Sequence, residues 1–89
     1  MPQRTPAKVA LGRAVSALRE RKGLTQERLA LESGLTRKAV SELERGLTYP
    51  RLDSLDRIAA AVGVDRRQIL GEASELEARA RGERPAGDS

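Results

Sequence analysis

The chain of 89 residues has no cysteine and no histidine, and a single tyrosine is its only aromatic residue. Without cysteine there are neither disulfides nor thiolate chemistry, and an intracellular address fits this composition best. Without histidine, the usual general base and the commonest metal ligand are missing. The core must therefore be built from Leu, Val, Ile and Ala, and a core this small favours dimerisation or near-ideal helix packing.

Other features are missing as well. No apolar run approaches the roughly 20 residues of a membrane span, and no signal-peptide pattern opens the chain. Metal-ligand spacing, a Ser/His or Cys/His set and a phosphate-binding glycine loop are all absent, and "GRA" around Gly12 is no nucleotide motif. We therefore expect no enzyme, no metal, no cofactor and no membrane partner, and a cytoplasmic, nucleoid-associated protein.

Charge is distributed unevenly along the chain. Residues 1–70 carry 14 Lys/Arg and 8 Asp/Glu, a net of +6, whereas residues 71–89 carry 3 and 5, a net of −2. A basic body with a mildly acidic tail is consistent with a polyanionic partner. Charge alone is weak support, however, because many solvated helical faces are rich in arginine.

The sequence divides into three segments. Residues 1–6, "MPQRTP", hold two prolines and no periodicity, which predicts a flexible arm. Residues 7–70 form the main domain, and residues 71–89 form a C-terminal extension that is partly helical with a disordered end. One apolar face runs to about residue 81, although Gly71 weakens a helix there by about 1 kcal/mol. This segment is either a frayed tail or a helix packed on a second subunit.

Apolar spacing predicts five short helices and no strand. The first runs from residue 7 to about 22 and ends before Gly23. Three later helices start with a capping residue that follows an apolar residue suited to a hydrophobic staple, and these caps are Thr25, Thr36 and Asp65. A further helix spans 52–62. The fold class is therefore all-α.

The two helices around Gly34 are spaced as a helix-turn-helix unit. Only "SGL" separates them, so they cross steeply, and the turn needs a residue that tolerates positive φ. Ala30 is small enough for the crossing. Val40 and Leu43 give the second helix a buried side.

The stretch "LTQERLALESGLTRKAVSELERGLTYPRLDSLDRIAAAVGV" resembles the DNA-binding domain of the Cro/phage-repressor family, also called the xenobiotic-response-element family. The resemblance covers roughly residues 9–70 and includes Thr25-Gln26, Ala30, Gly34, Val40, Leu43-Glu44-Arg45-Gly46 and Pro50. It implies a five-helix lambda-repressor-like domain that binds operator DNA, usually as a two-fold symmetric dimer. The recognition helix would be about Thr36–Arg45.

This recognition helix would open with Arg37 and Lys38, although the positive end of a helix dipole favours anions. In a recognition helix that enters the major groove N-terminus first, DNA supplies those anions. Reading a guanine with arginine contributes about 1–3 kcal/mol of discrimination, whereas the dipole conflict costs about 0.3–1 kcal/mol. The alternative is that both cations are good helix formers that point to water.

The resemblance also assigns contacts to individual residues. Those expected to reach base edges are Thr36, Arg37, Lys38, Ser41 and Glu42. Those expected to contact phosphates are Thr25, Gln26, Arg45, Thr48, Tyr49 and Arg51. Gln26 could instead be solvated, Glu42 a surface charge, and Tyr49 a cover for the core.

Two further positions follow from the same resemblance. Arg19 and Glu44 are expected to pair and brace the recognition helix, a structural role. Arg51 departs from the family, where Ser or Thr commonly caps the next helix. Arginine cannot accept from backbone N–H groups, so that helix start is expected to be less secure, and Arg51 to contact phosphate instead.

These features favour a transcriptional regulator that binds double-stranded DNA sequence-specifically as a homodimer. Its palindromic operator would have half-sites about 34 Å apart. The alternative is an interaction protein such as an antitoxin, which would bind a small protein partner through residues 71–89 and autoregulate through the same domain. A restriction-modification controller and a small prophage-type repressor are equally compatible with the sequence.

Overall fold

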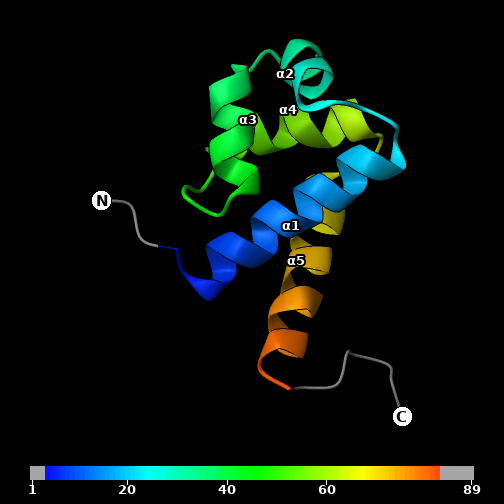
Figure 1. The fold of residues 1–89 in the computed structure, drawn as a ribbon. Coiled ribbons are helices and arrows are strands. Elements are labelled where there is room, and N and C mark those ends of the chain that lie inside the picture. The colour runs from blue at the N-terminus through cyan, green and yellow to red at the C-terminus, as the bar shows by residue number, and fades with distance from the viewer. Residues whose placement is uncertain (1–3, 83–89) are drawn as a thin grey trace.

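Five α-helices and no strand make up residues 4–82, the part of the chain that the computed structural model describes. The helices are α1 (Pro6–Arg21), α2 (Gln26–Ser33), α3 (Arg37–Glu44), α4 (Leu52–Val62) and α5 (Arg66–Ala80). In Figure 1, α2, α3 and α4 gather at one end, α1 crosses the middle, and α5 extends to the opposite end. The predicted all-α, five-helix fold class is confirmed. None of these described helices has the length and apolar character to span a bilayer.

The core is aliphatic and is shared by all five helices. Its fully buried larger side chains are Val15, Leu29, Val40, Ile58 and Ile69. α1 packs against α3, α4 and α5, while α2 packs against α3 and α4. α1 therefore joins α5 to the helices at the other end of the molecule.

The predicted caps are confirmed at three helix starts. The side chains of Thr25, Thr36 and Asp65 each accept a backbone N–H from the residue three positions later, at 3.0 Å. The apolar residues that precede these caps are partly buried against the core, as a staple requires. Arg51 makes no side-chain cap bond at the start of α4, which agrees with the chemistry of its guanidinium.

The start of the first helix differs from the prediction. α1 begins at Pro6, and the Thr5 hydroxyl accepts the Lys8 N–H at 3.2 Å. Proline is well suited to the first helical position because its missing N–H has no partner there. Residues 5 and 6 thus belong to the helix start rather than to an arm. Residues 1–3 and 83–89, including the end expected to be disordered, lie outside the described residues.

The expected segment boundary after residue 70 falls in the middle of α5. This helix continues past Gly71 to Ala80 and packs along α1 of the same chain. Ala73 is buried in the core, and Leu76 packs against it. Arg21 of α1 also forms an ion pair with Glu72 of α5. Residues 71–80 are therefore part of the last helix of the fold.

Candidate nucleic-acid interface

α2, the turn after it and α3 form the helix-turn-helix. Gly34 ends α2 with φ = 74°, a left-handed conformation that an L side chain adopts only with strain. The Leu35 N–H then returns to the Ala30 carbonyl at 3.1 Å. Val40 and Leu43 bury the inner side of α3 in the core. The opposite side of α3 therefore faces outward.

α3 also rests directly on α1. A Cβ added at Gly12 would lie 2.4 Å from the Leu43 carbonyl oxygen and 2.8 Å from that of Glu44. Such distances are far inside van der Waals contact, so the two helices can approach this closely only because residue 12 is glycine. The C-terminal end of α3 thus packs directly against α1.

The Glu44 carboxylate connects three elements at this end of α3. It accepts from Arg19 Nε at 2.7 Å, from Arg19 Nη2 at 3.1 Å and from Gln26 Nε2 at 3.0 Å. Arg19 Nη1 also donates to the Leu24 carbonyl at 2.7 Å. The hydrogen bonds to Glu44 raise the pKa of Arg19 above its ordinary value, although partial burial opposes the shift. The Glu44 side chain is only 6% exposed, so this pair braces α3 from inside the molecule.

The Gln26 side chain is part of this network. Its amide nitrogen is held by Glu44, and the residue is half-buried at the first position of α2. The other residue expected to contact phosphate at this point, Thr25, is exposed and caps the helix. Both therefore lie at the N-terminal end of α2, where backbone N–H groups have no partner within the helix.

The residues expected to contact bases lie along α3. Thr36, Arg37 and Lys38 are exposed at its N-terminal end, whose first turn contains no acidic residue. Ser41 and Glu42 are half-buried one turn further along. The first three can thus reach a partner in front of the helix end, while Ser41 and Glu42 are less accessible.

Arg37 has a carboxylate partner that sequence reasoning missed. Its Nε lies 3.1 Å from Oε1 of Glu27, in the first turn of α2. Part of the negative charge near Arg37 therefore comes from the protein itself, in addition to the anions that DNA is expected to supply. Residues 27 and 37 share no helix, so no local spacing rule connects them. Only the crossing of α2 and α3 brings them together.

The segment after α3 continues this face. Arg45 is exposed at the C-terminal end of α3, and Thr48 donates its hydroxyl to the Tyr49 carbonyl at 3.2 Å. Tyr49 is about half exposed and does not belong to the buried core; the Lys8 ammonium lies 5.4 Å from its ring centroid. A groove of about 230 Å³ is lined in part by Glu42, Thr48, Tyr49 and Arg51.

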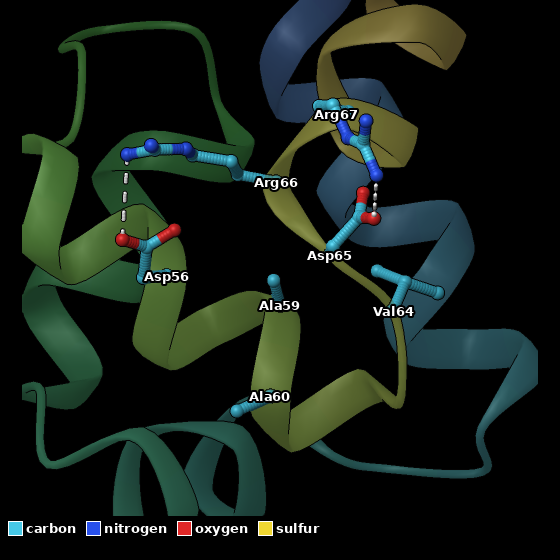
Figure 2. A pocket seen from close by; sticks show the side chains of 7 residues that line it. All are labelled: Asp56, Ala59, Ala60, Val64, Asp65, Arg66 and Arg67. Atoms are coloured by element: carbon cyan, nitrogen blue, oxygen red, sulfur yellow. Dashed lines mark hydrogen bonds and ion pairs between the residues drawn. The ribbon is translucent and has the colours of Figure 1, made fainter.

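A second hollow lies between α4 and the start of α5 (Figure 2). It measures about 510 Å³, and its two arginines are paired: Arg66 lies 3.5 Å from Asp56, and Arg67 lies 3.2 Å from Asp65. The Gln68 backbone N–H, and then Arg67, lower the pKa of Asp65. None of the residues expected to contact DNA lines this hollow. We therefore assign it no role in the interface.

A helix-turn-helix whose second helix carries exposed cations at its N-terminal end defines a class of DNA-binding domains. A family model described as helix-turn-helix matches residues 15–69. The chain belongs to this helix-turn-helix family, and the predicted Cro/phage-repressor relationship is confirmed.

Its relatives include an immunity repressor of Bacillus phage phi105, 33% identical over 64 residues, which cover 72% of this chain and 44% of the repressor. The chain thus matches less than half of that protein. Control protein C.BamHI of Bacillus amyloliquefaciens is 33% identical over 64 residues, which cover 71% of this chain and 79% of that protein. A solved structure of the clp gene regulator ClgR from Corynebacterium glutamicum superposes with a TM-score of 0.83 at 30% identity, covering 90% of this chain and 85% of that one.

Proposed function

We propose that the protein is a sequence-specific regulator of transcription that binds double-stranded DNA through α3. The observation that carries this proposal is the N-terminal end of α3, where Thr36, Arg37 and Lys38 are all exposed and no carboxylate lies in the first turn. A helix that enters the major groove by this end brings its first residues to the base edges. The names of the relatives, which include repressors and other transcriptional regulators, support the same role.

The residues divide into two kinds of contact. Arg37 and Lys38 would donate to base edges, and arginine pairs in bidentate fashion with guanine O6 and N7. Thr36, Ser41 and Glu42 would make the remaining base contacts. Glu42, as a carboxylate, would accept a hydrogen bond from a base donor such as cytosine N4.

Phosphate contacts would fix the position of the protein on the duplex. The residues proposed for this role lie on both sides of α3: Thr25, Gln26, Arg45, Thr48, Tyr49 and Arg51. Because Glu44 holds the Gln26 amide at 3.0 Å, the side chain meets a backbone phosphate in a fixed orientation. Contacts of this kind set the register but carry no sequence information.

A homodimer is supported by an apolar groove beside the loop that follows α3. Tyr49, Leu52 and Leu70 are large apolar residues with exposures of 52%, 59% and 43%, and all three line this groove of about 350 Å³. Of the described residues that line it, Glu77 alone is charged, in a chain that is 34% charged. Exposed apolar residues gathered in one groove favour it as the surface for such a contact.

A second copy of the chain is the partner that suits this groove. Leu52 lines the groove and is largely exposed, so a two-fold contact can bury the leucines of both copies against each other's grooves, as self-complementary interfaces do. In a dimer that meets at this groove, we expect the two α3 helices to lie about one DNA turn, roughly 34 Å, apart.

Selection of bound duplexes from a random pool tests the proposed function. We expect the protein to enrich a palindrome whose half-sites lie about one helical turn apart. Binding to the selected duplex should weaken steeply as salt increases, because neutralised phosphates release counterions. Recovery of a pool with no common sequence would contradict the proposal.

A further inference from the structure

Glu27 and Arg37 form an ion pair across the front of the helix-turn-helix. Glu27 lies in the first turn of α2 and Arg37 in the first turn of α3, and Arg37 Nε lies 3.1 Å from Glu27 Oε1. Both side chains face solvent, with exposures of 59% for Arg37 and 69% for Glu27. An ion pair this exposed contributes little to stability. Its position on the proposed DNA-binding face therefore points to a role in binding.

We infer that Glu27 determines specificity by orienting Arg37 for a base edge and by disfavouring its capture by backbone phosphates. The inference rests on the proposed function. Glu27 would act through Arg37 rather than by touching a base itself, which makes it a positioning residue.

The atoms of the pair explain the orientation. Glu27 contacts Arg37 through Nε, on one edge of a rigid planar guanidinium. The two terminal nitrogens, Nη1 and Nη2, form the end of that plane, and a pair of N–H groups from them fits guanine O6 and N7. Attraction of the Nε edge to Glu27 favours one placement of the Arg37 side chain before DNA arrives, and such preorganisation strengthens the contact that uses this geometry.

The charge of Glu27 explains the discrimination. On non-specific DNA the partners of Arg37 are phosphates, and an exposed carboxylate beside the guanidinium repels them. At a guanine, Arg37 meets neutral acceptors and can keep its ion pair with Glu27. The Glu27 carboxylate thus weakens binding to non-specific DNA more than binding to the selected site. Specificity is the difference between these two affinities.

The test compares Glu27→Gln with a matched control, Glu32→Gln. Both substitutions remove one negative charge from α2, but Glu32 pairs with Arg28 of the same helix at 2.7 Å and not with α3. For each protein, affinity is measured for the selected duplex, for the same duplex with its arginine-read guanine pair replaced, and for a random duplex. We expect Glu27→Gln to lower the specific-to-random ratio by about five- to tenfold, the low end of what a bidentate base contact supplies.

Glu32→Gln is expected to raise all three affinities alike and to leave the ratio unchanged. In an Arg37→Ala background, Glu27→Gln should no longer change discrimination at the replaced guanine, because its effect passes through Arg37. The inference would be overturned if Glu27→Gln kept the wild-type specific-to-random ratio, or if it lowered this ratio equally with and without Arg37. Either result would leave the proposed function standing. A wild-type protein that selects no duplex would overturn the proposed function and this inference with it.

Discussion

Glu44 is the residue on which the geometry of the interface depends most. Its carboxylate is bound by Arg19 from α1 and by Gln26 from α2 while it sits at the end of α3. An ion pair of this kind adds little net stability compared with apolar side chains of the same shape, yet removing one partner leaves an uncompensated charge inside the protein. The network therefore specifies where α3 lies more than how stable the fold is.

Glu44→Ala is expected to lower the free energy of unfolding by about 3 kcal/mol, because Arg19 then stays partly buried without its partner. The double variant Arg19→Met, Glu44→Leu should recover much of that loss, because it removes both charges and keeps the volume. Chemical denaturation of the three proteins measures both effects. A double variant no more stable than Glu44→Ala would show that the pair stabilises the fold in its own right.

The residues of this site were predictable to different degrees. The Arg19–Glu44 pair could be expected from the family resemblance, and the cap at Thr36 from its place before a helix. The Arg37–Glu27 pair could not, because its partners lie on different helices and their approach depends on the angle at which α2 and α3 cross. Contacts that tertiary geometry creates leave no periodic trace in the sequence.

At the scale of elements, the boundaries of α2, α3, α4 and the start of α5 were predictable from caps and glycine stops. α4 occupies the predicted residues 52–62, and Gly63 ends it with φ = 79°. At the N-terminal end the predicted helix start was misplaced, and at the C-terminal end the prediction left the course of the chain after residue 70 open. Thr5 and Pro6 form a recognisable helix start. They lie in a short polar stretch without apolar periodicity, however, and the sequence therefore predicted an arm there. α5 runs through Gly71 because Ala73 and Leu76 pack against the core, and this packing outweighs a propensity cost of about 1 kcal/mol.

Gly12 and Gly71 give opposite predictions for the same substitution within a helix. Gly71→Ala should stabilise the protein by about 0.4–1 kcal/mol, since a Cβ there meets nothing within 4 Å and alanine restricts the unfolded chain. Gly12→Ala should destabilise it by about 1–3 kcal/mol, because the methyl group would push α1 away from the backbone of α3. Thermal unfolding of both variants measures the difference. Stabilisation by Gly12→Ala would contradict the close approach of α1 and α3.

At the scale of the whole molecule, the proposed dimer makes a prediction about exposed leucines. Leu52→Glu and Leu70→Glu should convert the dimer to a monomer, because each places a charge in the apolar groove. Leu31→Glu is the control, since Leu31 is 71% exposed and does not line that groove. Sedimentation of the wild type and the three variants measures the oligomeric state. A wild-type monomer, or dimers that persist in both groove variants, would contradict the assignment of this surface.

Sequence-specific reading of DNA by the N-terminal end of α3 is tested most directly with Arg37→Ala. Its affinity is measured beside that of the wild type on the selected operator and on a panel of duplexes that each carry one altered base pair. We expect Arg37→Ala to lose about 1–3 kcal/mol of discrimination at one guanine in each half-site and to keep its preferences elsewhere. Uniform weakening across the whole panel would mean that Arg37 is held by phosphates and that α3 does not read bases through this residue.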